Sequence, residues 1–219
     1  MIPLSAPELS PALLVALPLG VALWSFMEYA LHRFAFHEAS GSNYGSREHL
    51  RHHGSEDSVL ESWYLSWAGV LLVSLLLIPT LGGLVGLPSV GWGVGLGYLV
   101  GYAFYDWVHW RAHRRPIPAG RFGRYEASVR HHHFIHHFHE PMKNHGVTSP
   151  FWDHVFGTHV SADKVRIPRR LAMRWLVDDD GAVRPEYADR YEIRGATALT
   201  DEQRRIDRER AFANEAPVA

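Results

Sequence analysis

Two long stretches without any charged residue are the strongest pattern along this chain. The first runs from Leu9 to Met27, and the second runs from Ser62 to Tyr105. A helix needs about 20 apolar residues to cross the hydrocarbon core of a bilayer. The first stretch is therefore long enough for one membrane span. The second is long enough for two spans joined by a turn near Pro79–Pro88.

These stretches predict membrane helices at residues 9–31, 63–80 and 89–113, the last of which continues past the bilayer. A further helix is expected at residues 127–140. The glycine-rich run Val90–Gly101 favours a membrane setting, because small residues let membrane helices approach closely but weaken a helix in water. The alternative is a soluble fold in which a buried core helix and a buried hairpin occupy the same residues.

The segments outside the apolar stretches are polar. Residues 38–62 contain a histidine-rich helical turn, and residues 114–126 form a basic connection punctuated by proline and glycine. We therefore predict a membrane-embedded domain at 1–160 and a charged C-terminal segment at 161–219. Within that segment, Thr200–Gln203 has the pattern of a capping box that opens a short helix.

Composition narrows the chemistry that this chain can perform. The 219 residues include no cysteine, which excludes disulfides, iron–sulfur clusters and thiolate zinc sites. The net charge of −1 gives no indication of nucleic-acid binding. The mean hydropathy of −0.15 is an average over apolar and polar segments and hides the division between them. The unusual feature is the content of sixteen histidines.

The arginines predict which side of the membrane the histidines occupy. Two groups follow the first and third apolar segments: Arg33, Arg47 and Arg51, then Arg111, Arg114, Arg115, Arg121 and Arg124. Both groups lie on the histidine side, which the positive-inside rule assigns to the cytoplasm. Because Met1–Ser10 contains no lysine or arginine, we expect no cleaved signal peptide.

Ten of the histidines form four short motifs. They are H-x4-H at His32 and His37, H-x2-H-H at His49, His52 and His53, H-x3-H at His109 and His113, and H-x2-H-H at His133, His136 and His137. Positions three and four apart share one face of an α-helix, so the last three motifs present their side chains from one side. Positions five apart lie about 140° apart. We therefore expect His32 on the last turn of the first helix and His37 just beyond its end.

The four motifs together predict a metal centre. Ten imidazoles can supply five ligands to each of two metal ions and leave open positions for dioxygen or water. An all-nitrogen set of ligands suits iron, zinc, copper or nickel. One H-x3-H pair alone carries little weight, because isolated histidines are usually ordinary core or surface residues. The other six are expected to support the centre or lie at the surface: His131, His132, His139, His145, His154 and His159.

Three acidic residues lie within one helical turn of a histidine motif. They are Glu28, Glu48 and Asp106. Metal-bound histidines usually donate their second ring N–H to a carboxylate or carbonyl, which fixes the orientation of the ring. We expect the three carboxylates to serve as such acceptors. The alternative is a helix-end charge at the membrane interface.

Several of these segments resemble the histidine boxes of the fatty acid hydroxylase/sterol desaturase superfamily. They are Glu28–His37, Tyr105–His113 and His133–His137, and Gly146–Thr158 resembles the segment after the last box. The H-x4-H spacing with this ending is most similar to the fatty acid 2-hydroxylase branch. The resemblance extends from Trp24 to His159.

Motifs and resemblance together lead us to expect an all-α membrane enzyme. About three membrane helices would carry a cytoplasmic, histidine-rich helical cap that holds two metal ions, with iron in the active form and zinc in purified material. The resemblance implies hydroxylation of a C–H bond of a lipid acyl chain, at the 2-position. The reaction would use dioxygen and electrons from a b-type cytochrome or a ferredoxin with its reductase.

Three alternatives remain open at this stage. The same scaffold serves desaturation, or hydroxylation of a sterol or carotenoid. A membrane metal-binding or transport protein belongs to another class. Transport would favour ionisable side chains in mid-membrane, where the apolar stretches have none. An inactive structural relative is the third alternative, which the complete set of histidine motifs disfavours.

Overall fold

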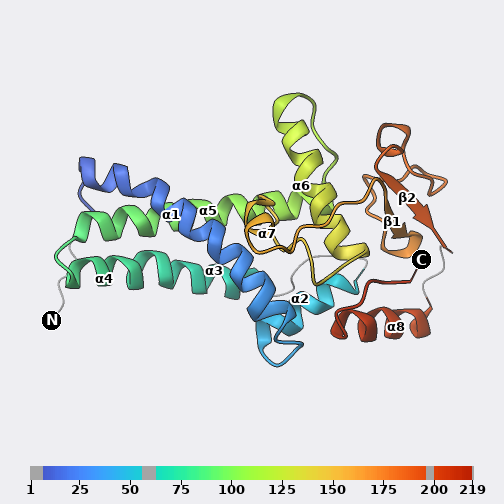
Figure 1. Ribbon diagram of the computed structural model, residues 1–219, viewed down its shortest axis with the longest axis horizontal. Helices are drawn as coiled ribbons and strands as arrows, with labels where there is room; N and C mark the ends of the chain where they lie inside the picture. Colours follow the sequence, from blue (N-terminus) through green and yellow to red (C-terminus); the bar gives the residue numbers. More distant parts are fainter. Residues whose placement is uncertain (1–6, 56–62, 196–199, 219) are drawn as a thin grey trace. The chain divides into compact units, whose positions relative to one another are not determined.

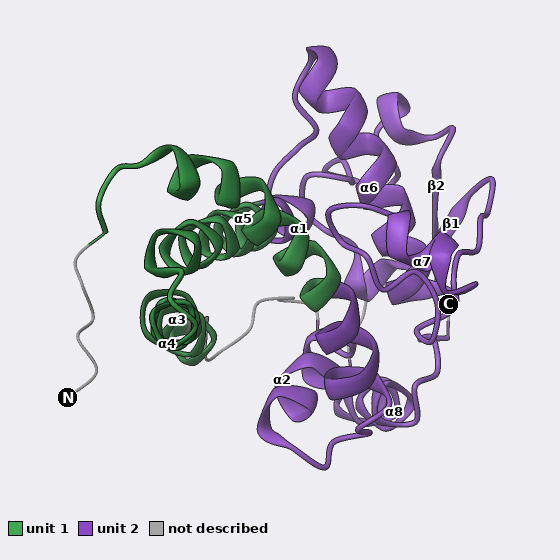
Figure 2. Cartoon of the chain, turned by 60° about the vertical axis from the view of Figure 1, so that its left-hand side comes forward, with its two compact units in different colours: residues 1–28, 62–107 green, residues 29–61, 108–219 purple. Residues whose placement is uncertain are grey.

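The computed structural model describes residues 7–55, 63–195 and 200–218, and these residues are mostly helical (Figure 1). By compactness the chain divides into two units (Figure 2). Unit 1 comprises Met1–Glu28 and Ser62–Trp107, and unit 2 comprises Tyr29–Glu61 and Val108–Ala219. The predicted boundary at residue 160 falls inside unit 2.

Unit 1 is built from the apolar helices. They are α1 (Pro11–Ala30), α3 (Trp63–Leu72), which continues through a π-helix (Val73–Leu77) into α4 (Ile78–Leu84), and the first part of α5 (Pro88–Arg114). Helices therefore occupy all three of the predicted apolar regions. The turn between the second and third of these regions lies between Leu84 and Pro88, within the proline- and glycine-rich stretch where it was predicted.

Glycine allows α1 and α5 to touch backbone to backbone. A Cβ atom added to Gly97 would lie 2.1 Å from the carbonyl oxygen of Leu17, and one added to Gly20 would lie 2.1 Å from that of Val94. No side chain fits in such a space. Gly93, Gly97 and Gly101 thus form the face of α5 that packs against α1, a use of small residues that is typical of membrane helices.

Two helical stretches are long and apolar enough to cross a membrane. They are Pro11–His37 and Tyr64–Leu84, with mean hydropathies of 1.6 and 2.0. This assignment rests on length and composition, which a core helix or a signal sequence can share. Among the described residues α5 does not meet the criterion, because glycine and tyrosine lower its hydropathy. A third span at α5 therefore stays a prediction.

Unit 2 contains the histidine-bearing elements and the C-terminal segment. Its elements are a π-helix (Leu31–His37), α2 (Tyr44–His53), the end of α5, α6 (Gly120–Phe138), α7 (Phe151–Val155), β1 (Val165–Pro168), 3₁₀ turns at Arg169–Leu171 and Pro185–Tyr187, β2 (Tyr191–Arg194) and α8 (Asp201–Phe212). The expected helix at 127–140 begins earlier, at Gly120. One half of the expected capping box is present, since the Thr200 hydroxyl accepts from the Gln203 backbone N–H at 3.1 Å, while the Gln203 side chain donates to Asp207 at 3.2 Å.

The described residues are mostly helical, as expected, and a small two-stranded sheet is added to the helices. Strand β1 pairs in parallel with β2, with Val165 opposite Tyr191. The strand has a physical reason to form, because Val165 and Ile167 are both fully buried while Arg166 between them is exposed. Alternate side chains of a strand point to opposite faces, so this pattern is that of a strand with one face buried.

The core of unit 2 joins the C-terminal segment to α6. Phe134, Ile135 and Phe138 of α6 pack with buried side chains from the residues beyond 160, among them Ile167, Leu171, Trp175, Leu176 and Tyr191. The apolar residues of α6 thus contact the C-terminal segment, while the histidines of the same helix gather with those of other elements. The C-terminal segment is therefore part of the support of α6.

Candidate metal centre

The structure gathers all ten motif histidines into two buried clusters within unit 2. The first cluster is His32, His37, His49, His53 and His136; the second cluster is His52, His109, His113, His133 and His137. Within each cluster, one ring nitrogen from every residue lies within 4.8 Å of all the others. The division into two sets of five matches the number of ligands expected for two metals.

The H-x4-H motif corrects the prediction that the helix ends before His37. The chain continues as a π-helix over Leu31–His37, and both histidines are buried. The backbone N–H of Glu38 donates to the carbonyl of Arg33 at 2.9 Å, which is the i→i+5 bond of this helix type. The wider turn brings residues five apart onto the same face. His32 and His37 therefore enter one cluster from successive turns of one continuous helix.

Each H-x2-H-H motif contributes to both clusters. On α2, His49 and His53 belong to the first cluster and His52 to the second. On α6 the arrangement is reversed, with His136 in the first cluster and His133 and His137 in the second. The clusters adjoin, because the rings of His53 and His137 stack with centroids 4.1 Å apart.

The distances between ring nitrogens fit a bound cation. The Nε2 atom of His49 lies 3.0, 2.9 and 3.1 Å from the Nε2 atoms of His32, His37 and His53. A neutral imidazole nitrogen offers one N–H or one lone pair, so it cannot form three hydrogen bonds at once. Two nitrogens bound about 2.1 Å from one metal at a right angle would be ~3.0 Å apart. The spacing is that of ligands converging on a common centre.

The second cluster shows the same convergence. Nε2 of His113 lies 3.0 Å from Nε2 of His133, and Nε2 of His109 lies 3.1 Å from Nε2 of His52. The Nε2 atom of His137 is buried and has no hydrogen-bond partner among the described residues. A buried polar atom without a partner is costly. A metal ion bound by the cluster would satisfy it.

The electrostatics favour neutral imidazoles, the form that binds metals. Burial lowers the pKa well below the ordinary value for five histidines on α2 and α6, and the neighbouring histidines lower it further: His49, His53, His133, His136 and His137. Because each cluster offers nitrogen atoms alone, it suits iron or zinc better than magnesium or calcium, which prefer oxygen.

The second ring nitrogens of the first cluster are held by groups that the motifs did not reveal. His136 Nδ1 lies 2.7 Å from the carbonyl oxygen of Lys143, and His32 Nδ1 contacts the carbonyl oxygen of His145. His37 Nδ1 lies 2.8 Å from Oδ1 of Asn214. Backbone carbonyls carry no signal in the sequence, and Asn214 lies in the segment to which sequence analysis assigned no site residue.

Two of the three carboxylates predicted to accept from ligand imidazoles form hydrogen bonds with other side chains. Glu48 accepts from Arg51 at 2.6 Å, and Asp106 accepts from the indole of Trp67 at 3.2 Å. Glu28 is buried in unit 1. A contact between any of these three and a ligand imidazole stays a prediction.

Asp153 organises the segment between α6 and β1. Its carboxylate is fully buried and accepts from the backbone N–H groups of His145 and Gly146, the hydroxyl of Thr158 and Nε2 of His132. Burial alone would raise the pKa of Asp153, but these hydrogen bonds outweigh it and hold the pKa well below the ordinary value. His132 thereby supports the segment as a partner of Asp153.

His145 lies outside the four motifs but is buried against the first cluster. It is fully buried, and its ring lies 5.5 Å from that of His32, 5.7 Å from that of His37 and 5.6 Å from that of His136, measured between centroids. From the sequence we expected His145 among the supporting or surface residues. Its burial against the first cluster assigns it to the support.

A buried ion triad ties the end of α5 to α6. Glu126 accepts from Arg111 at 2.7 and 3.1 Å and from Arg130 at 2.9 Å. Glu126 and Arg130 are both fully buried. Since Arg111 is on α5 and the other two are on α6, the triad holds together the two helices that supply most of the second cluster.

Comparison with known proteins finds one family. The fatty acid hydroxylase family model matches residues 17–158, a range that includes all ten clustered histidines. No solved structure matches the chain.

Curated relatives agree with this match. A dihydroceramide fatty acyl 2-hydroxylase of Arabidopsis thaliana is 29% identical over 160 residues, covering 70% of this chain and 62% of the plant protein. A ceramide very long chain fatty acid hydroxylase of Saccharomyces cerevisiae is 31% identical, covering 66% of this chain and 38% of its own. A human fatty acid 2-hydroxylase is 33% identical, with 64% and 38% covered. The chain thus spans less than two thirds of the length of these relatives.

Proposed function

Because the chain belongs to the fatty acid hydroxylase family, we propose that it is a membrane-bound di-iron oxygenase that hydroxylates a lipid acyl chain at the 2-position. The observation that carries the proposal is the pair of buried five-histidine clusters inside the matched region. When bound there, two metal ions would supply the activation of dioxygen that insertion into an unactivated C–H bond requires, since no side-chain acid or base can supply it.

The substrate class is proposed from the relatives. The plant and human relatives are named as 2-hydroxylases of fatty acyl groups, the yeast relative is named as a hydroxylase of ceramide very long chain fatty acids, and the matches cover 64–70% of this chain. The sequence features of the 2-hydroxylase branch, H-x4-H and the Gly146–Thr158 segment, lie within the matched residues. A lipid acyl chain is therefore the proposed substrate, with dioxygen as co-substrate.

Insertion of unit 1 into a bilayer is supported by the surface that its helices expose. Val15 on α1 is 74% exposed and Leu77 is 47% exposed, and only 33% and 17% of the two apolar windows is buried. Contiguous apolar surface of this kind is unfavourable in water and suited to lipid. The proposed cytoplasmic position of the histidines follows from the arginines around the motifs.

The residues of the two clusters have a clear task in this proposal. Their neutral imidazoles would hold the metals, and their burial would keep bulk water away from them. Backbone carbonyls of Lys143 and His145 orient His136 and His32 from behind. We propose iron as the native metal, with zinc able to replace it in purified material, and a separate b-type cytochrome or ferredoxin system as the electron donor.

The test is lipid analysis in a host that makes no 2-hydroxylated lipids. Cells expressing the chain, grown under isotopically labelled dioxygen, should accumulate 2-hydroxy acyl lipids carrying one labelled oxygen atom. The matched control is the double variant His136→Ala, His137→Ala, which removes one ligand from each cluster and should give no product.

Other products would select the alternatives. A new double bond would indicate a desaturase, and a hydroxylated sterol or carotenoid would change the substrate class. Unaltered lipids in cells that load the protein with iron and supply a compatible donor would reject the enzymatic proposal.

A further inference from the structure

Asn214 is joined to His37 of the first cluster by two hydrogen bonds. Its Oδ1 atom lies 2.8 Å from Nδ1 of His37, and its Nδ2 atom donates to the carbonyl oxygen of His37 at 3.1 Å. The same amide nitrogen lies 3.4 Å from the hydroxyl of Ser40. One side chain therefore holds both the ring and the backbone of a residue 177 positions away.

These two contacts fix the protonation pattern of the His37 ring. Because Nδ2 of Asn214 must donate to a carbonyl, its Oδ1 atom faces the imidazole and can only accept. Nδ1 of His37 therefore carries the proton, and Nε2 is left with its lone pair free. That Nε2 atom lies 2.9 Å from Nε2 of His49 and 3.1 Å from Nε2 of His136. The lone pair belongs to the atom that converges with the other ligands.

The backbone at Asn214 has the conformation this contact needs. Helix α8 ends at Phe212, and Asn214 follows with a φ of +56°. Asparagine and glycine adopt this left-handed conformation more readily than other residues. The residue type at this position thus meets two requirements at once, the turn after the helix and the amide that faces His37.

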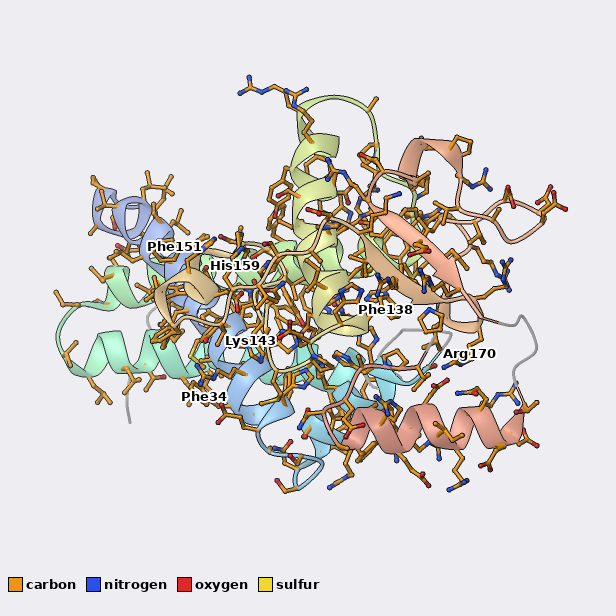
Figure 3. The ribbon with its side chains drawn as sticks, turned by 45° about the vertical axis from the view of Figure 1, so that its right-hand side comes forward. Phe34, Phe138, Lys143, Phe151, His159 and Arg170 are labelled. Atoms are coloured by element: carbon orange, nitrogen blue, oxygen red, sulfur yellow. The ribbon has the colours of Figure 1, made fainter. Side chains whose placement is uncertain are left out.

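Two further contacts hold α8 where Asn214 can reach the cluster. Arg170, labelled in Figure 3, donates to both oxygens of Asp207 on α8 at 2.7 and 2.6 Å, and both side chains are nearly fully buried. The ring of Phe212 packs over Gly41, where an added Cβ would lie 3.0 Å from it. Helix α8 is therefore a fixed element of unit 2.

We propose that Asn214 is a positioning residue for the metal ligand His37, so that the C-terminal segment completes the first cluster. Asn214 lies outside residues 17–158, the region that the family model matches. The inference rests on the proposed function, since His37 is a metal ligand only if the cluster binds metal. It assigns to the C-terminal segment a role in metal affinity rather than in membrane association.

Two substitutions distinguish the contribution of the Asn214 side chain from that of its left-handed backbone conformation. Asn214→Gly keeps the left-handed turn and removes both hydrogen bonds, whereas Asn214→Asp keeps an acceptor for Nδ1 of His37. The control is Glu209→Gln on the exposed surface of α8, where the Glu209 carboxylate pairs with Arg205 at 2.6 Å. Metal content of the purified full chain is measured by mass spectrometry, before and during competition with a chelator.

We expect Asn214→Gly to release metal from one cluster at a chelator concentration about 10- to 100-fold lower than the parent protein requires. Asn214→Asp should resist the chelator more nearly as the parent does, and Glu209→Gln should match the parent. Equal resistance of Asn214→Gly and the parent would overturn the inference and leave the proposed function intact. Equal weakness of the Gly and Asp variants would also overturn it, because the acceptor would then be irrelevant. A parent protein that binds no metal at all would overturn the proposed function as well.

Discussion

Replacing Asp153 with asparagine removes the charge from a fully buried carboxylate while keeping its size. In the native protein Oδ1 accepts from the His145 backbone N–H at 2.8 Å and the Thr158 hydroxyl at 2.7 Å. Oδ2 accepts from the Gly146 backbone N–H at 2.8 Å and from His132 at 3.0 Å. In Asp153→Asn, an amide nitrogen must occupy one of these two positions and face a backbone donor.

The cost follows from that count of donors. A buried N–H that loses its acceptor costs about 1–3 kcal/mol, and the bonds that remain lose the strengthening given by the charge. We therefore expect Asp153→Asn to destabilise the protein by about 2–4 kcal/mol. In a domain of this size, that corresponds to a fall in unfolding temperature of roughly 5–15 °C.

The assay is thermal unfolding in detergent, followed by tryptophan fluorescence, with metal content measured in parallel. Because the carbonyl of His145 contacts Nδ1 of His32, loosening this segment should also weaken metal retention by the first cluster. The matched control is Asp163→Asn, an exposed position where a change within about 0.5 kcal/mol is expected. If the two variants unfold together and retain metal equally, the role assigned to Asp153 is refuted.

Three other predictions concern the clusters and their support. His32→Ala and His109→Ala each remove a ligand from one cluster, so the metal content measured by mass spectrometry should fall from about two ions per chain to about one; an unchanged content would contradict the assignment. Glu126→Gln leaves the buried Arg130 without its carboxylate and should cost about 3–5 kcal/mol in thermal unfolding, and a midpoint equal to the parent's would show that the triad is dispensable. In the metal-free protein, burial holds the pKa of buried histidines such as His49 and His133 below the unfolded value, so the unfolded chain takes up protons first as the pH falls below about 6.5. The free energy of unfolding should therefore be highest above about pH 6.5 and should fall at lower pH, by up to about 1.4 kcal/mol per pH unit for each such histidine. Equal unfolding temperatures at about pH 5.5 and 7.5 would contradict this.

The sequence predicted well where the helices lie and which ten histidines lie close together. Charge-free stretches mark α1, α3 to α4 and α5, because a change from apolar to polar residues is visible in any single sequence. The i, i+3 and i+4 spacings of His49, His52 and His53 place three imidazoles on one side of α2, and the structure does gather them with the other motifs. These features depend on local periodicity alone.

The parts that the sequence did not predict depend on contacts that have no local pattern. A π-helix at Leu31–His37 cannot be recognised from a period of 3.6 residues, so His37 was expected beyond the helix end. The acceptors behind the ligands were expected to be nearby carboxylates. Two of them are instead backbone carbonyls, which every residue possesses, and the third is Asn214, which only the tertiary fold brings to His37.

The π-helix at Leu31–His37 also bears on how such a centre tolerates insertions and deletions. Two imidazoles separated by three residues on an α-helix, or by four on a π-helix, emerge from the same face one turn apart. The loss of a single codon between His32 and His37 can therefore be absorbed by a change from π-helix to α-helix, which keeps both rings on one face. The number of residues between the two ligands can then differ by one among descendants of one ancestral gene, while both rings still point to the same side.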